Sequence, residues 1–201
     1  MGQLLAEALN VPFIDADDLH PKANVDKMSN GEPLNDDDRK PWLDIVRAAA
    51  VKACRAEGSG HETGVVVGCS ALKLSYRNLL RGIVESEVEE GEDNTPPHGG
   101  HLRTFFGFID GPKEVLFERM HARKNHFMKA KMLESQLATL EDPRGEEGVF
   151  EIRLVDAMDD QVRTALEALA EHDVRPARSA HPAREEVGQG VPVTLGSDKK
   201  V

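Results

Sequence analysis

The segment GVVVGCSALKLSYRNLLRGI, residues 64–83, indicates the class of fold. It opens with a run of valines, which is typical of a strand buried on both faces of a parallel sheet. Small residues break this run at Gly68, Cys69, Ser70 and Ala71, and a helical pattern then begins. A strand that leads through a short turn into a helix is the repeating unit of an α/β domain.

The same alternation continues on both sides of this segment. Short apolar runs predict further strands over 11–16, 101–111 and 148–157. Helical spacing predicts helices over 22–30, 36–58, 112–124 and 159–172. The order of these elements favours a parallel sheet with helices on its faces. Ligands of such sheets bind beyond the carboxyl ends of the strands, where the chain carries Asp15, Asp17, His20, Cys69, Ser70, Lys73, Asp110 and Asp156.

The length and composition set limits on the organisation of the chain. Its 201 residues fit one domain over 1–172, followed by a tail over 173–201 that we expect to be disordered. The acidic stretch 85–100, rich in Gly and Pro, predicts a flexible insertion. A net charge of -11 argues against a nucleic-acid partner, whereas a local cluster of arginines could still bind a small anion.

The location of the protein is predicted from what its sequence lacks. The two cysteines form no disulfide framework, and the first residues carry no basic region of a signal peptide. No apolar run approaches the ~18 residues of a membrane span. We therefore expect a soluble cytoplasmic protein without a membrane partner.

The motif DADDLHP, residues 15–21, follows the first predicted strand. Carboxylates at such a position can hold a water bound to Mg²⁺ or accept a proton from an attacking hydroxyl. The alternative is that these aspartates only cap a turn.

The motif GEPLNDDDRKPWL, residues 31–43, also has two interpretations. The three aspartates suit the first turn of a helix, where the helix dipole favours negative charge. Arg39 follows them directly. An arginine held by neighbouring carboxylates is oriented to bind a substrate carboxylate or phosphate through two hydrogen bonds.

Two further segments carry positive charge. After the small residues that follow the central strand, Lys73 and Arg77 lie one helical turn apart, and with the helix N-terminus they favour an anion. Cys69 is expected to be a small buried side chain rather than a nucleophile. The segment 118–143 is basic at its start and suits a lid that closes over phosphates, although a solvated basic surface is the plainer interpretation.

Together, and in this order, these motifs resemble gluconate kinase, a family of P-loop small-molecule kinases. The matching segments are FIDADDLHP (13–21), NVDKMSNGEPLNDDDRKPWL (24–43), CSALKLSYRNLLR (69–81) and RKNHFMKAKMLESQLATLEDP (123–143). The resemblance covers residues 2 to about 170 and implies the three-layer α/β fold of the adenylate and shikimate kinases. It also implies ATP- and Mg²⁺-dependent phosphorylation of D-gluconate to 6-phospho-D-gluconate, which feeds the pentose phosphate route. A homodimer would be consistent with the resemblance.

The resemblance also implies a set of site residues. Asp17 would be the catalytic base, Asp15 would lie near the water shell of Mg²⁺, and Arg123 would stabilise the phosphate in transfer. Arg119 and Arg123 would bind ATP, with Arg123 in a lid region over 121–142. The sugar-acid pocket would contain His20, Arg39, Ser70, Lys73, Arg77 and Gln136, with Arg39 as the first choice for the substrate carboxylate.

The sequence departs from the family at its beginning. The family opens with a strand and a G-x-x-x-x-G-K-[ST] loop that binds phosphates, whereas Met1 aligns inside the helix after that loop. We expect a sheet without this strand, in which two neighbouring strands have open edges. The favoured explanation is a truncated product or an incorrect start site of an active kinase. The alternative is a natural short form that binds gluconate or a partner without phosphoryl transfer.

Overall fold

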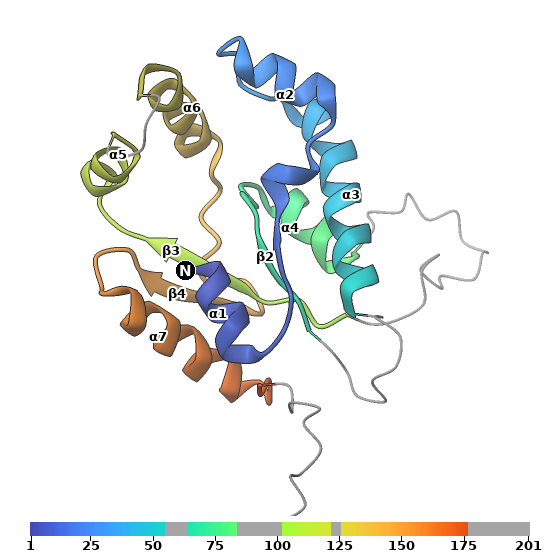
Figure 1. Ribbon diagram of the computed structural model, residues 1–201, viewed down its shortest axis with the longest axis vertical. Helices are drawn as coiled ribbons and strands as arrows, with labels where there is room; N and C mark the ends of the chain where they lie inside the picture. The colour runs from blue at the N-terminus through green and yellow to red at the C-terminus, as the bar shows by residue number, and fades with distance from the viewer. Residues whose placement is uncertain (55–63, 84–101, 122–125, 177–201) are drawn as a thin grey trace, which may run out of the picture.

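The computed structural model describes residues 1–54, 64–83, 102–121 and 126–176 (Figure 1). The predicted insertion over 85–100, the tail from 177 onward, Gly58 and Arg123 lie outside the described residues, as do the side chains of 126–131. The predictions made for them therefore stay predictions.

The described elements follow the predicted alternation. The strands are β1 (Phe13–Asp15), β2 (Val66–Gly68), β3 (Phe106–Asp110) and β4 (Val149–Arg153). The helices are α1 (Gly2–Leu9), α2 (Lys22–Ser29), α3 (Asp36–Cys54), α4 (Leu74–Arg81), α5 (Lys113–His121), α6 (His126–Thr139) and α7 (Met158–Glu171), with a short 3-10 helix, η1 (Ala16–Leu19). Each described strand lies inside the segment that predicted it, although it is shorter.

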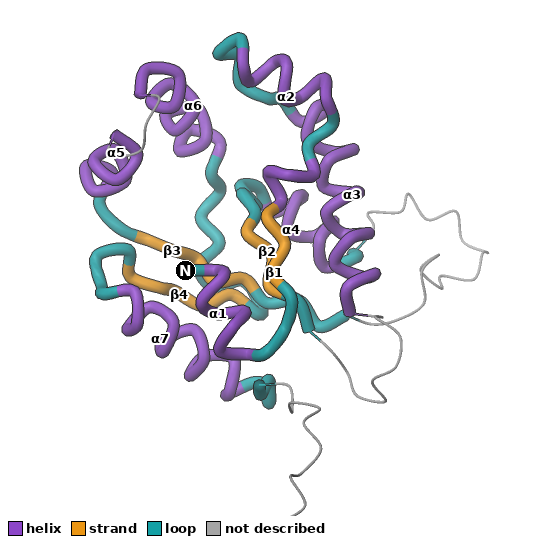
Figure 2. The backbone as a smooth tube through the Cα atoms, in the orientation of Figure 1, coloured by secondary structure: helices purple, strands orange, loops and turns teal. Residues whose placement is uncertain are grey.

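The strands are parallel, as predicted, but they form two pairs (Figure 2). β1 pairs with β2 from Phe13–Val66 to Asp15–Gly68. β3 pairs with β4 from Phe106–Val149 to Asp110–Arg153. Within the described residues no ladder of hydrogen bonds joins the two pairs, which agrees with the expectation that neighbouring strands have open edges.

The expectation that residues 64–71 form a strand buried on both faces is wrong. Val66 and Val67 of β2 are only partly buried. Among the described strands β2 has a neighbour on one edge alone, so no described strand shields its other edge. Its two faces pack against different parts of the molecule: Val67 lies against the cluster around α3, and Val66 lies against the cluster around α1.

Two apolar clusters form the core. The first joins η1, α3 and α4 and consists of Ala16, Trp42, Leu43, Val46, Leu72 and Tyr76. The second joins α1, β4 and α7 and consists of Leu5, Leu9, Ile152, Ala165 and Leu169. α1 contacts β1, β2 and α7, so it connects the two strand pairs.

The acidic start of α3 has the simple structural role that the sequence suggested. The Asp38 carboxylate accepts from the backbone N–H of Asn35 at 2.8 Å, and the Asn35 side chain accepts from the N–H of Asp38 at 2.9 Å. These reciprocal bonds satisfy donors that a helix start leaves without partners.

Candidate functional site

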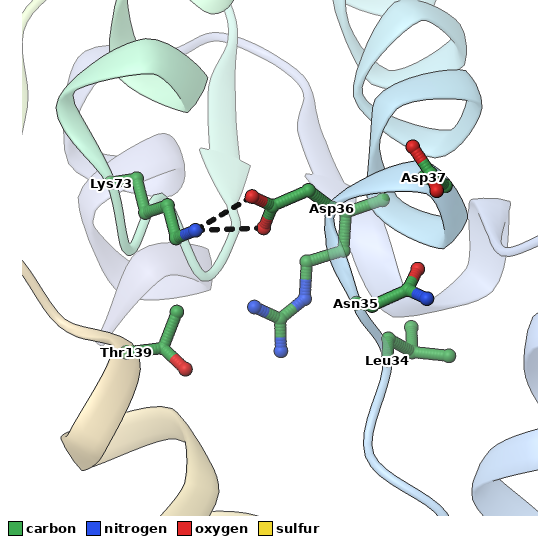
Figure 3. A pocket seen from close by; sticks show the side chains of 7 residues that line it. Leu34, Asn35, Asp36, Asp37, Lys73 and Thr139 are labelled. Atoms are coloured by element: carbon green, nitrogen blue, oxygen red, sulfur yellow. Dashed lines mark hydrogen bonds and ion pairs between the residues drawn. The ribbon is translucent and has the colours of Figure 1, made fainter.

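A pocket of about 460 Å³ opens where three distant segments meet. Its lining residues are Leu34, Asn35, Asp36, Asp37, Arg39, Lys73 and Thr139. They come from the start of α3, the residue before α4 and the last residue of α6. In Figure 3, Lys73 and Thr139 lie across the pocket from Leu34 and Asn35. The folded chain therefore brings together two segments that the sequence had singled out separately, the DDDR motif and the residues after β2.

An ion pair connects two walls of this pocket. Lys73 Nζ donates to both carboxylate oxygens of Asp36, at 2.8 and 2.7 Å. The Tyr76 hydroxyl donates to the same carboxylate. These two donors, Lys73 first, lower the pKa of Asp36. Asp36 thus links the start of α3 to the start of α4, in addition to its place in the acidic first turn.

Arg39 lines the pocket although its residue is only 6% exposed. Its guanidinium carbon lies 5.9 Å from the centre of the Tyr76 ring. The predicted fork of neighbouring carboxylates is wrong in detail, because Asp36 binds Lys73, and Asp38 binds Lys27 at 2.5 Å. In the described part of the chain neither carboxylate forms an ion pair with Arg39. Tyr76, through its ring and its hydroxyl, rather than a pair of carboxylates, therefore orients this cation.

His20 lies in a fixed orientation next to the catalytic candidate Asp17. Its ring stacks on Trp42 with centroids 4.2 Å apart, and the Trp42 indole donates to the carbonyl of Ala16 at 2.7 Å. The Nε2 atom of His20 lies 4.0 Å from a carboxylate oxygen of Asp17. Burial, and to a smaller extent the Arg39 charge, lower the pKa of His20, while Asp17 acts in the opposite direction.

Asp15 and Asp17 are both exposed at the carboxyl end of β1. Asp15 accepts from the backbone N–H of Asp17 at 3.1 Å, so the turn-capping interpretation holds for it. Partial desolvation at this strand end and then the Asp15 charge raise the pKa of Asp17, although its side chain is 83% exposed. Two exposed carboxylates suit the water shell of Mg²⁺, which usually binds one or two carboxylates and keeps several waters. Among the described residues no group of three His, Cys, Asp or Glu side chains could hold a metal.

The remaining predicted residues lie at varied depths. Ser70 is half-buried in the turn after β2, and Gln136 is half-buried in α6, three residues before Thr139 of the pocket. Arg119 is exposed on α5, which Figure 1 shows next to α6 beyond the end of β3. Burial, and then the charge of Asp17, raise the pKa of the Cys69 thiol to about 12. The thiol therefore stays protonated at neutral pH.

Arg77 is placed differently from the other pocket candidates. It is 2% exposed and does not line the pocket. Its guanidinium donates to Glu146 through Nε, at 3.0 and 3.1 Å, and through Nη2, and it donates to the carbonyl of Ala71 at 2.8 Å. This geometry favours a structural role, because the donors of Arg77 are directed to the chain itself.

Some residues at the site were not found from the sequence. Asn24 is buried between His20 and the start of α3, and Tyr76 lies under the two pocket cations. Thr139 closes the pocket from α6. Local spacing did not point to the first of these, because His20 has an extended backbone and lies before α2, so that His20 and Asn24 share no helix.

Comparisons with known proteins agree with the geometry. No family model matches the sequence. The chain is 42% identical over 147 residues to a probable gluconokinase of Schizosaccharomyces pombe, covering 73% of this chain and 68% of that protein. It is 41% identical over 143 residues to the thermoresistant gluconokinase of Escherichia coli, covering 71% and 69%.

A solved structure shares the fold. The crystal structure of a gluconokinase from Sinorhizobium meliloti matches with a TM-score of 0.66 and 41% identity, over 85% of this chain and 83% of that one. This similarity confirms the predicted α/β kinase fold. None of the helices in the described ranges is long and apolar enough to cross a membrane. On its sequence identity to these relatives and on its fold, the chain belongs to the gluconokinase family.

Proposed function

We propose that this chain catalyses the ATP-dependent phosphorylation of D-gluconate to 6-phospho-D-gluconate. The observation that carries the proposal is the buried Arg39 at the wall of a polar pocket, in a member of the gluconokinase family. D-gluconate has one carboxylate and a row of hydroxyls. A site for it needs one oriented cation and several groups that accept or donate hydrogen bonds.

The pocket offers both kinds of group. We assign the substrate carboxylate to Arg39, since its planar guanidinium can donate two parallel hydrogen bonds. Lys73, Asp36 and Thr139 line the same space and would bind hydroxyls. His20, Ser70 and Gln136 stay assigned to the sugar-acid pocket, whereas the buried Arg77 is proposed to support it without contacting substrate.

The transfer step would take place at the carboxyl end of β1. A substrate hydroxyl oxygen bonds to the γ-phosphorus of ATP, the bond to the β,γ-bridging oxygen breaks, and the hydroxyl proton passes to Asp17. A carboxylate whose pKa is raised accepts this proton more readily than an ordinary aspartate. ATP supplies the phosphoryl group, and Mg²⁺, when bound, would neutralise part of its charge. Asp15 would bind the water shell of the ion, and Arg119 and Arg123 would bind phosphates from α5 and the segment after it.

Three finer proposals go beyond the site itself, the first from the sequence and the other two from the family. We place the protein in the cytoplasm, we expect it to form a homodimer, and we place its product at the entry to the pentose phosphate route. Gel filtration with light scattering tests the dimer.

The first experiment measures ADP release that depends on gluconate. It uses this chain as given and the same chain extended by the strand and phosphate loop of a gluconokinase relative. We expect turnover in the extended protein, and calorimetry of gluconate binding with both proteins separates binding from transfer. Binding without turnover in both would support the short form that binds gluconate only. Neither binding nor turnover in either protein would overturn the proposal.

A further inference from the structure

Asn24 is a buried amide for which the proposed mechanism has no role. It lies on α2 and is 5% exposed. Its side-chain nitrogen Nδ2 donates to the carbonyl oxygen of Asp38 at 2.8 Å. The same nitrogen lies 3.4 Å from Nδ1 of His20. A buried amide usually satisfies its polar atoms, and here one nitrogen faces both neighbours.

The Asp38 contact determines which end of the amide faces His20. A backbone carbonyl oxygen can only accept, so the atom next to it must be the NH₂ group of Asn24 and not its oxygen. The second hydrogen of that NH₂ group is then available to His20. Nδ1 of His20 must accept it, and therefore the imidazole carries its proton on Nε2.

The rest of the surroundings fixes the ring itself. Stacking on Trp42, with an interplanar angle of 14°, sets the plane of the imidazole. The bond from Trp42 to the carbonyl of Ala16 in turn holds the indole. In this orientation Nε2 points to the side of Asp17, 4.0 Å from its carboxylate. Trp42 thus sets the ring plane, and Asn24 sets which nitrogen carries the proton.

We propose that Asn24 is a positioning residue that holds His20 in its Nε2–H tautomer, so that this N–H is directed to Asp17 and to a substrate hydroxyl beside it. The tautomer follows from the contacts of Asn24 alone. The proposed contact of the His20 Nε2–H with a substrate hydroxyl rests on the proposed function.

Nitrogen NMR of the full chain labelled with ¹⁵N-histidine tests the tautomer directly. The chain has 8 histidines, and a His20→Gln variant identifies the signals of His20. We expect the Nε2–H tautomer in the unchanged chain. A dominant Nδ1–H form, or an even mixture, would overturn the proposal before any variant of Asn24 is made.

Two variants of Asn24 then test the cause. Asn24→Ala removes the donor and should give a mixture of tautomers. Asn24→Asp places an acceptor opposite Nδ1 and should move the proton to that nitrogen. An unchanged tautomer in a folded variant would contradict the proposal. Lys27→Met is the matched control, because Lys27 also joins α2 to Asp38 but does not contact His20. If Lys27→Met shifts the tautomer as much as Asn24→Ala, Asn24 acts only by docking α2, and the proposal fails.

Kinetics of the extended, active protein test the functional part. For Asn24→Ala we expect kcat/KM for gluconate to fall about 10- to 100-fold, as when a histidine loses the group that orients it. Lys27→Met should stay within about threefold of the unchanged enzyme, a shift of at most ~0.7 kcal/mol. Absence of gluconate turnover in every protein would defeat the proposed function but leave the tautomer result standing. A shifted tautomer with unchanged kcat/KM would refute the positioning role.

Discussion

The two halves of the molecule are stabilised in different ways. The half built on β1, β2, α3 and α4 buries charged and amide side chains, namely Asn24, Arg39 and Arg77. The half built on β3, β4 and α7 has one buried polar side chain among the described residues, Gln161, which donates to the carbonyls of Leu154 and Asp156.

This difference separates the site from its scaffold. Burying a charge costs free energy unless it is paired or bonded. Arg77 meets that requirement through Glu146, whereas Arg39 borders a pocket in which a substrate anion could complete its bonding. The pocket on the apolar half, lined by Leu4, Asp159, Val162, Arg163 and Leu166, includes none of the buried residues of that half. Ile152 and Ala165 are nearly inaccessible. Substitutions in the first half should therefore be able to change substrate binding, whereas substitutions in the second half should change only the stability of the chain.

The largest expected effect breaks the link between the halves. Glu146 precedes β4 and binds Arg77 and Arg81 of α4. Glu146→Ala would leave the charge of Arg77 buried without its carboxylate, and we expect a loss of about 3–5 kcal/mol in the free energy of unfolding. Urea denaturation at pH 7 measures it. The control Glu167→Ala removes an exposed carboxylate 3.9 Å from Arg163 and should cost about 0–1 kcal/mol. Equal losses of unfolding free energy in the two variants would contradict the role of Glu146 as the carboxylate that compensates the buried charge of Arg77.

Acid unfolding sharpens the same prediction. Hydrogen bonds from Arg77, and secondarily from Arg81, hold the pKa of Glu146 below its ordinary 4.5 in the folded chain. Its contribution is therefore complete above pH 4.5 and is lost as the pH falls through the lowered pKa. We expect the stability of the unchanged chain to fall more steeply below that pH than that of Glu146→Gln. If the free energy of unfolding of the two proteins depends on pH in the same way, Glu146 is not paired in solution.

Arg39→Ala tests the binding half. Loss of the charged partner of the substrate carboxylate should lower kcat/KM for gluconate by an amount equivalent to roughly 2–5 kcal/mol. Arg39→Lys keeps the charge but not the two parallel donors, so an intermediate loss is expected. Steady-state kinetics of the extended protein measure both. Arg163→Ala on the exposed face of α7 is the control, and a loss there as large as at Arg39 would remove the distinction between the halves.

Ile152→Ala tests the apolar half. Ile152 is 1% exposed in β4, and its truncation should destabilise the chain by about 2–5 kcal/mol because it leaves a cavity. The KM for gluconate should not change at temperatures where the variant is folded. Thermal unfolding and kinetics on one preparation measure both quantities. A raised KM with unchanged stability would mean that β4 contributes to the site.

Local patterns predicted the elements and the residues near strand ends, but not the pairings across the chain. The motifs after β1 and β2 and at the start of α3 were found because strand ends and helix starts have short signatures. The partners of Arg77 and Lys73 lie 69 and 37 residues away, and no local pattern specifies such contacts. The partial burial of β2 was missed because a valine run does not report whether a strand has neighbours on both edges.

The smallest expected effect concerns Tyr76, whose ring lies beside the pocket cations Arg39 and Lys73. Tyr76 is 5% exposed, its hydroxyl donates to Asp36, and its ring lies 5.9 Å from the guanidinium of Arg39. Tyr76→Phe removes the hydroxyl and keeps the ring, so the free energy of unfolding should fall by about 0.5–1.5 kcal/mol, as for one hydrogen bond. Tyr76→Leu removes the ring as well and should also raise the KM for gluconate, because Arg39 loses the surface against which it packs. Urea denaturation and gluconate kinetics on both variants separate the two contributions. If Tyr76→Phe raises KM as much as Tyr76→Leu, the bonds of the Tyr76 hydroxyl to Asp36 and Arg39, and not the packing of Arg39 on the ring, determine the shape of the pocket.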